Sequence, residues 1–308
     1  AFLVFDVLVF FFIIRILGKL RLNRNMSGVY FWCPLMIKET YNSTHLDIIG
    51  ISFLCGSIYF LVHSRHTLAT FFLALGFLGK LYPAILFPLY IKACFEHCKK
   101  SEGNPWRTPI LNSLLFVGVI ILGYVPFMGI GLQMFDGLKA YSLYWQSNDS
   151  IFACLLFLFK NLPGDLNNIT FLSNSLPVFL SKLTVVCFLM GVLIWLLLKN
   201  TSLIKDPQTF LNQFFILMAL VFLLSPIQNP WYLCWVVPFL CLFPNRAWIL
   251  LTGLVGLYYL DFYFDYQEIQ SWSQWIPWLE YLPFYVLLIW DMRNKNRVLE
   301  AGKNNEIP

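Results

Sequence analysis

The 308-residue chain is 59% hydrophobic and 12% charged, and its formal net charge is +5. Soluble proteins carry about 25% charged residues, so this composition excludes an ordinary soluble domain and predicts an all-α, polytopic transmembrane protein. We attribute the excess of Lys and Arg to loops that set topology, and therefore expect the lipid bilayer and no nucleic acid as a partner. The eight Cys residues contain no C-x-x-C pair, so we interpret them as small buried side chains and expect no metal.

The chain starts at Ala1 inside an apolar segment, which we interpret as a missing N-terminal part. About eleven membrane segments follow, several of them broken or shorter than the roughly 17–25 residues that span a bilayer. They occupy residues 2–17, 28–37, 48–62, 67–95, 108–132, 151–159, 176–198, 210–224, 231–243, 247–260 and 276–290. No repeat or linker divides them, so we predict one membrane domain over residues 1–290 and a cytoplasmic polar tail over residues 291–308.

The apolar block at residues 67–95 determines the topology, because Lys80-Leu-Tyr-Pro83 interrupts its middle. A single span would place a cation at mid-bilayer, whereas two half-helices would place Lys80 facing water at their junction. With half-helices, 16 of the 21 Lys and Arg residues fall on one side of the membrane and 5 on the other; a single span gives 8 and 13. The positive-inside rule favours the first count, so we predict that Lys80 faces the lumenal or periplasmic side.

This topology groups five polar loops on the same, non-cytoplasmic face, at residues 38–47, 80–83, 133–175, 225–230 and 261–275. Several adjoining apolar segments are too short to cross the roughly 30 Å hydrocarbon core. Because bare backbone is not tolerated in lipid, such segments end in protein or in a water-filled space. We therefore expect a recessed cavity on that face.

The first candidate constellation is Asn42-Ser-Thr-His45-Leu-Asp47, just before an apolar segment. His45 and Asp47 could bind a sugar hydroxyl or a phosphate, or move a proton. The alternative is structural: Ser43 or Thr44 caps the next helix and Asp47 lies favourably in its first turn.

The second constellation is Lys80-Leu-Tyr-Pro83. An ammonium at a helix break needs an anionic partner, which a lipid-linked phosphate would supply; the alternative is a lysine that extends from a helix end to the interface. Two weaker groups follow. They are Asn229-Pro-Trp-Tyr232 after Ser225-Pro226, and the aromatic run Tyr141-Ser-Leu-Tyr144-Trp145 with Asn148.

In this order, Cys33-Pro34, His45-Leu-Asp47, Lys80-Leu-Tyr-Pro83, Tyr144-Trp145 with Asn148, and Asn229-Pro-Trp-Tyr232 resemble the motifs of the GT-C superfamily of integral-membrane glycosyltransferases. The similarity is greatest to the polyprenyl-phosphate-mannose-dependent mannosyltransferases, and it extends from about Ala1 to Trp290. Each motif is short, so the specificity lies in their order and common side.

The resemblance implies transfer of a hexose, mannose first, from a polyprenyl-phosphate donor to a lipid-linked or glycan hydroxyl with inversion. It implies that His45 and Lys80, with Tyr82, hold the donor phosphate and that Asp47 holds a sugar hydroxyl. The implied pocket residues are Tyr144, Trp145, Asn148, Asn229, Trp231 and Tyr232. The family's general base is an acid in the first lumenal loop; this chain starts after that loop, so we expect the base upstream of Ala1.

A second class of function fits part of the same pattern. Broken helices that meet in the membrane also form transport sites, so a multi-pass transporter or a flippase for lipid-linked sugars is the alternative. Against it, no inverted repeat is visible and the polar residues collect on one face. A structural subunit of a membrane complex is a third possibility without a positive feature. For the location we favour a bacterial inner membrane over the endoplasmic reticulum.

Overall fold

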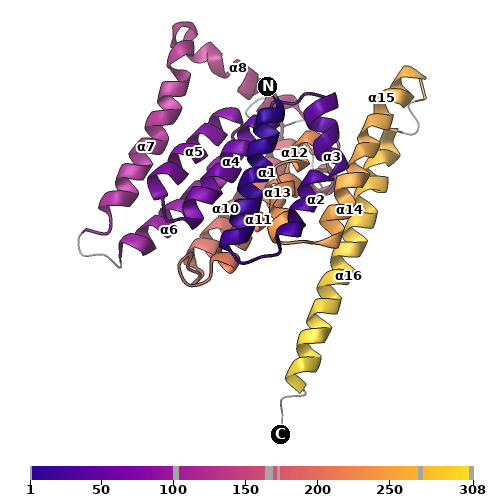
Figure 1. The fold of residues 1–308 in the computed structure, drawn as a ribbon. Coiled ribbons are helices and arrows are strands. Elements are labelled where there is room, and N and C mark those ends of the chain that lie inside the picture. The colour runs from indigo at the N-terminus through magenta and orange to yellow at the C-terminus, as the bar shows by residue number, and fades with distance from the viewer. Residues whose placement is uncertain (1, 100–103, 164–168, 172–173, 270–272, 305–308) are drawn as a thin grey trace.

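The computed structural model describes residues 2–99, 104–163, 169–171, 174–269 and 273–304, with only the backbone for residues 295–304. Helices dominate, as the composition predicts (Figure 1). The α-helices are α1 (Phe2–Lys19), α2 (Gly28–Phe31), α3 (Pro34–Ile37), α4 (Asp47–Val62), α5 (His66–Gly79), α6 (Phe87–Cys98), α7 (Arg107–Tyr124), α8 (Asp136–Tyr144), α9 (Ile151–Lys160), α10 (Leu176–Leu198), α11 (Pro207–Leu224), α12 (Pro230–Leu233), α13 (Val237–Leu242), α14 (Arg246–Leu254), α15 (Tyr258–Tyr266) and α16 (Ile276–Asn304).

Short 3-10 turns and one small hairpin connect these helices. The 3-10 turns are η1 (Arg24–Ser27), η3 (Tyr82–Leu86), η4 (Val125–Phe135), η6 (Val255–Leu257) and η7 (Ser273–Trp275), and η2 (Lys38–Asn42) is a π-helical turn. Strands β1 (Thr170–Phe171) and β2 (Asn174–Ser175) pair antiparallel. The hairpin lies beside α10 and far from the centre of the bundle, so the helices alone form the core.

The apolar block at residues 67–95 is broken in two, as predicted. Helix α5 ends at Gly79, Lys80 adopts an extended conformation with φ −165° and ψ 146°, and Pro83 lies in η3 before α6 begins. The ring of His66, at the start of α5, lies 4.9 Å from that of His97, near the end of α6. The two half-helices therefore run antiparallel, and Lys80 lies at the end of the bundle opposite to these histidines.

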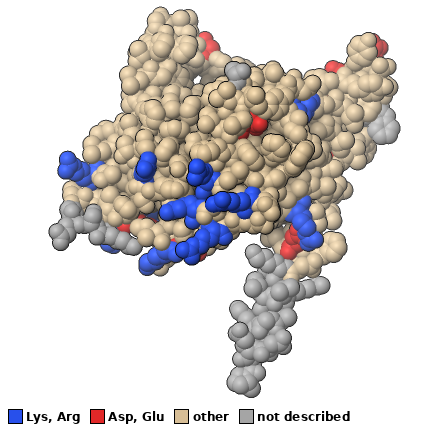
Figure 2. Space-filling view, viewed as in Figure 1, with Lys and Arg blue, Asp and Glu red and all other residues tan. Residues whose placement is uncertain are grey.

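The basic loops gather at that opposite end. Lys19, Ser64, His66, His97 and Pro207 line one cavity there, which brings four loops together. On the face shown in Figure 2, most Lys and Arg side chains lie in a band across the lower part of the molecule. The segregation matches the charge count that favoured half-helices; which side of a membrane this end faces stays a prediction.

Four helical stretches among the described residues are long and apolar enough to cross a membrane: Arg107–Tyr144, Leu176–Leu198, Pro207–Leu224 and Arg246–Tyr266. The first two are mostly exposed, with large apolar side chains such as Leu114 and Phe188 on the surface, whereas Pro207–Leu224 is largely buried. An apolar outer surface around a packed centre suits a lipid environment. The finer prediction of about eleven segments is not established by these four.

Two sequence-based expectations need adjustment. Helix α16 runs to Asn304 and passes residue 290 without a break, so no change of structure marks the predicted start of the tail; residues 305–308 lie outside the described part (Figure 1). The expected burial of the cysteines is wrong for Cys154 and Cys187, which are exposed on α9 and α10, although no disulfide forms within the described structure. Their helices present these faces outward because they lie at the edge of the bundle.

Candidate functional site

An ion pair between Asp47 and Lys80 lies at the end of the bundle where the polar loops meet. Lys80 Nζ donates to Asp47 Oδ1 over 2.5 Å, and Trp235 Nε1 donates to the same oxygen over 2.5 Å. The lysine side chain is 21% exposed and the aspartate side chain 11% exposed. Both donors bind Oδ1, which leaves Oδ2 open to a further donor. The anionic partner that Lys80 requires is thus supplied within the chain.

Three glycines bring these residues together. Helices α4 and α5 pack so closely that a Cβ on Gly79 would lie 3.1 Å from the Cα of Gly50, and one on Gly76 would lie 3.4 Å from the Gly50 carbonyl oxygen. The Trp235 ring covers the other side of Gly50, where an added Cβ would lie 2.5 Å from the ring. The first turn of α4 is therefore held against the end of α5, which is why Asp47 reaches Lys80.

Substituting Gly50 by Ala is expected to displace Trp235 and break its hydrogen bond to Asp47. A contact of 2.5 Å to a ring carbon is impossible, so the indole has to move, and overpacking of this kind costs about 1–3 kcal/mol. Gly118→Ala on α7 is the matched control, because nothing lies within 4 Å of its added Cβ. Thermal unfolding and tryptophan emission of both variants check this. Equal stability of the two variants would contradict the close packing.

Aromatic rings surround the ammonium. Lys80 Nζ lies 3.7 Å from the centre of the Tyr232 ring and 5.5 Å from that of Tyr82, within the range of cation–π attraction. The Tyr141 hydroxyl donates to that of Tyr232 over 3.1 Å. Beside them opens a cavity of about 310 Å³. Its walls are mostly apolar and come from Phe77, Leu78, Gly79, Lys80, Leu81, Tyr82, Tyr124, Met134, Phe135, Leu138, Tyr141 and Tyr232.

A second polar cluster lies on the other side of the Trp231–Tyr232 pair, whose ring centres are 5.8 Å apart. The His45 ring stacks on Trp231 with centres 4.2 Å apart, and its Nε2 lies 3.4 Å from Glu39 Oε2. Glu39 is 2% exposed, and its Oε1 accepts a 2.7 Å hydrogen bond from the Tyr259 hydroxyl. The site therefore has a cationic half at Lys80 and a carboxylate–imidazole half at Glu39.

Most of the predicted donor residues meet here. Lys80, Asp47 and Tyr82 lie in the cationic half, His45 lies in the other half, and Trp231 and Tyr232 separate the two. His45 and Lys80 therefore contact different rings, and His45 is positioned away from the expected phosphate partner.

Two structural alternatives are wrong as worded. Helix α4 begins at Asp47 with Leu46 at its N-cap and no side-chain cap, so neither Ser43 nor Thr44 caps it, and the Ser43 hydroxyl accepts from Lys38 instead. The other half of that alternative is confirmed, because Asp47 lies in the first turn of α4. Lys80 does not extend as an unpaired lysine to the surface, because it is paired with Asp47 and mostly buried.

The predicted pocket residues Tyr144 and Trp145 do not line the cavity, although the Trp145 ring lies 5.8 Å from that of Tyr141, which does. Their side chains are 71% and 55% exposed, where α8 ends at Tyr144 and Trp145 adopts an extended conformation. That extended segment leads to Ser147, which pairs with Pro226 and Gln228 through backbone hydrogen bonds. Tyr141, one turn earlier on α8, provides the ring that lines the cavity.

The two predicted asparagines take structural positions beside the site. Asn148 donates to Glu280 Oε2 over 2.7 Å and to the Gln228 carbonyl over 3.3 Å. Asn229 is 3% exposed, and its Oδ1 makes no hydrogen bond to another described residue. Asn148 thus connects two loops, while Asn229 keeps an unused acceptor directly before Pro230.

Sequence reasoning missed Trp235, Glu39 and Tyr259 as site residues, and it named Tyr141 only as the start of the weaker aromatic run. Glu39 carried a usable signal, since an acid two positions after the apolar run Pro34–Ile37 is costly in a membrane protein unless it has a function. Trp235 carried none, because a tryptophan in an apolar helix reads as core.

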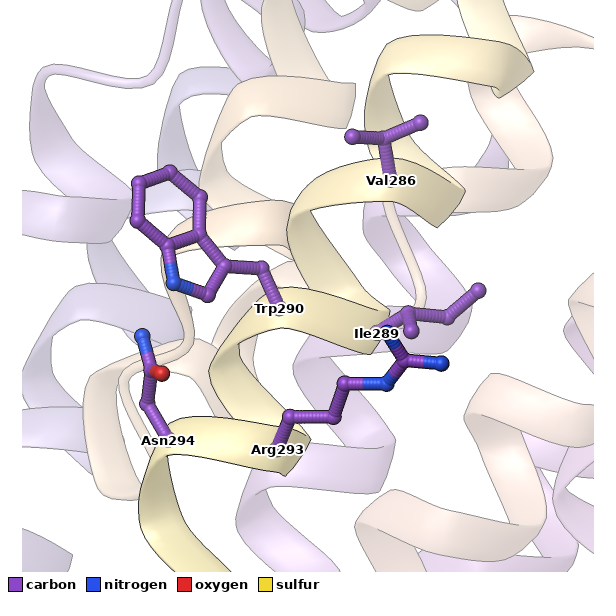
Figure 3. A pocket seen from close by; sticks show the side chains of 5 residues that line it. All are labelled: Val286, Ile289, Trp290, Arg293 and Asn294. Atoms are coloured by element: carbon purple, nitrogen blue, oxygen red, sulfur yellow. The ribbon is translucent and has the colours of Figure 1, made fainter. Parts of the chain in front are cut away.

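A separate hollow lies elsewhere, along α16, and does not involve these residues. Figure 3 shows Val286, Ile289, Trp290, Arg293 and Asn294 around a space of about 440 Å³ along α16, with all five side chains from that one helix. A tryptophan and an arginine about one turn apart within α16 suit anchoring at a membrane interface.

Comparisons with protein-family models, with curated proteins and with solved structures found no match.

Proposed function

We propose that the chain transfers a hexose, mannose first, from a polyprenyl-phosphate donor to the hydroxyl of a lipid-linked or glycan acceptor, with inversion. The observation that carries this proposal is the position of Lys80. Its ammonium lies where the polar cluster meets a mostly apolar cavity of about 310 Å³. A polyprenyl phosphate has the matching chemistry, an anionic group at the end of an apolar chain.

Lys80 binds the donor phosphate. One of the three N–H groups of the ammonium donates a hydrogen bond to Asp47, and the other two are available to donate to phosphate oxygens. When the glycosidic bond breaks, negative charge grows on the phosphate, and a fixed ammonium in a site of low dielectric stabilises that charge. The apolar walls supplied by Leu78, Leu81, Met134 and Leu138 accommodate the first isoprene units.

Asp47 and the aromatic pair hold the sugar. Oδ2 of Asp47 accepts a hydrogen bond from a sugar hydroxyl, while Oδ1 keeps Lys80 and Trp235 in place. Tyr232 offers a ring face beside the ammonium, and aromatic faces pack well on the C–H side of a hexose. The proposal includes a multi-pass chain of about eleven segments, with this end on the non-cytoplasmic side of a bacterial inner membrane.

Transfer from a radiolabelled mannosyl polyprenyl phosphate, by the purified chain in lipid nanodiscs, tests the proposal. We expect release of free polyprenyl phosphate and labelling of a lipid-extract acceptor, with no transfer from a nucleotide-activated mannose. Mannosyl polyprenyl diphosphate is the control for the phosphate linkage of the donor, and we expect no transfer from it. If the donor binds but only crosses the bilayer of reconstituted vesicles unchanged, the chain is a carrier for lipid-linked sugars and the transferase proposal is wrong.

A further inference from the structure

The Glu39–His45 cluster has the composition of a proton-transfer site. Glu39 is 2% exposed, and one of its two oxygens is bound by the Tyr259 hydroxyl. The other oxygen, Oε2, is buried, makes no hydrogen bond within the described part of the chain and lies 3.4 Å from His45 Nε2. Lys38 Nζ lies 3.9 Å from Oε1, so the unused acceptor of this buried carboxylate is Oε2, and the imidazole is the group placed to supply a proton to it.

The imidazole is the accessible member of this pair. The His45 side chain is 31% exposed, whereas that of Glu39 is 3% exposed. A substrate hydroxyl therefore reaches the imidazole and not the carboxylate. Stacking on Trp231, with ring planes 22° apart, fixes the plane of the imidazole.

Two rare backbone features hold this arrangement. Glu39 lies in the π-helical turn η2, and Thr44, immediately before His45, has φ +53°. Single π-turns occur often at functional sites, and a β-branched residue in the left-handed region is strained by about 1–3 kcal/mol. Strain retained beside a buried carboxylate indicates that the position of His45 is maintained for a purpose other than packing.

We propose that His45 is the general base of the transfer reaction and that Glu39 is its positioning residue; this rests on the proposed function. The acceptor oxygen forms a bond to the anomeric carbon as the bond from that carbon to the phosphate oxygen breaks, and the electron pair leaves with the lipid phosphate. The acceptor proton passes to the imidazole and then to water. The carboxylate of Glu39, whose Oε2 lies 3.4 Å from Nε2, favours a proton on that nitrogen and stabilises the imidazolium, so the other ring nitrogen is the base.

This assignment places the base within the chain, where the sequence resemblance had expected it upstream of Ala1. The separation of the site fits the two roles. Lys80 lies over Tyr232 and His45 over Trp231, so the group for the leaving phosphate and the base contact different rings of an adjacent aromatic pair. Inversion requires the nucleophile and the leaving group on opposite faces of the sugar.

Azide distinguishes a base from a merely structural residue. It is an anionic nucleophile that needs no deprotonation, so it reacts at the anomeric carbon without a base and yields a glycosyl azide and free lipid phosphate. We expect His45→Ala, in the full chain in nanodiscs, to lose transfer to a hydroxyl acceptor by about 100- to 10,000-fold while keeping donor affinity. Sodium azide should restore consumption of the mannosyl polyprenyl phosphate. Glu39→Gln should lose less, and azide should restore it also.

His63→Ala is the matched control, because His63 lies at the basic end and bonds only to the Tyr59 carbonyl in the described structure. A His45→Ala variant that binds donor but gains no azide product, or one that keeps full transfer, overturns the assignment while leaving the transferase proposal intact. If His45→Ala fails to fold, Glu39→Gln decides by the same azide readout. If the unaltered chain neither binds donor nor consumes it, the proposed function itself is wrong.

Discussion

Replacing Lys80 by methionine is expected to weaken binding of the donor phosphate by about 10- to 100-fold and to abolish sugar transfer. The estimate follows from the loss of charge-assisted hydrogen bonds to the phosphate, worth about 1.5–3 kcal/mol each, at about 1.4 kcal/mol per tenfold change in affinity. Methionine keeps the length and apolar contacts of the lysine stem. Equilibrium binding of mannosyl polyprenyl phosphate in nanodiscs measures the effect.

The ion pair permits a sharper form of this experiment. Lys80→Met leaves the mostly buried Asp47 with Trp235 as its remaining side-chain partner among the described residues, so it also destabilises the fold. The double variant Lys80→Met with Asp47→Asn removes that unpaired charge and should be more stable than Lys80→Met alone, yet still fail to bind donor. Asp47→Asn alone should retain phosphate binding, because Lys80 keeps its charge, but lose transfer.

Lys139→Met on α8 is the control, since Lys139 is exposed at the same end of the bundle. It should bind donor as well as the unaltered chain does. If Lys80→Met binds the donor as tightly as the unaltered chain does, the phosphate does not bind in the cationic half of the site. Weak binding by Asp47→Asn, with normal stability, would instead assign the phosphate to both residues.

The sequence was sufficient to predict the break at Lys80. A proline three residues after a lysine in an otherwise apolar block cannot be accommodated in a continuous membrane helix without loss, and the charge count fixed the alternative. The same reasoning grouped the polar loops at one end, which the contacts of Asp47 with Lys80 and of Ser147 with Gln228 bear out. These two predictions succeeded because they depend only on the length of each apolar segment and on the direction in which the chain crosses the bundle.

The pairing within the site depends on packing that periodicity does not contain. Asp47 meets Lys80 because Gly50 and Gly79 let two helices approach closely, and Trp235 joins them because Gly50 also leaves room for its ring. None of these contacts follows from residue type alone. Tyr144 and Trp145 were expected in the pocket because their rings resembled sugar-binding aromatics, and the end of α8 placed them at the surface.

Glu280 is a second residue whose contacts residue type alone does not predict, and here the contacts concern the stability of the fold. The sequence placed it near the start of the last membrane segment, where an acid reads as an interfacial residue. In the structure it is fully buried, with Oε1 accepting from the Tyr258 backbone N–H and Oε2 from Asn148 Nδ2, each over 2.7 Å. Through these two bonds α16 holds both the start of α15 and the loop that pairs with Gln228.

Replacing Glu280 by leucine is therefore expected to destabilise the protein by about 2–5 kcal/mol. Two partly buried N–H donors lose their Glu280 acceptors, and each unsatisfied group costs about 1–3 kcal/mol. Glu280→Gln should have a smaller effect, because its amide oxygen still accepts one hydrogen bond while its NH₂ group faces the other donor. Unfolding in detergent by heat or denaturant measures the stability of each variant and so ranks them.

Asp265→Asn is the control for the loss of an acid near this helix pair, because Asp265 is exposed on α15. Measuring donor binding separates an effect on stability from an effect on function. Lys80 directly follows α5, and its aromatic neighbours come from η3, α8 and α12, whereas the hydrogen bonds of Glu280 go to Tyr258 and Asn148. Folded Glu280→Gln protein should therefore bind donor normally. A leucine variant as stable as Asp265→Asn would contradict the role of the two hydrogen bonds. A Glu280→Gln variant that is stable yet unable to bind donor would instead extend the site into α16, since the carboxylate would then act on the ligand rather than on the loops around it.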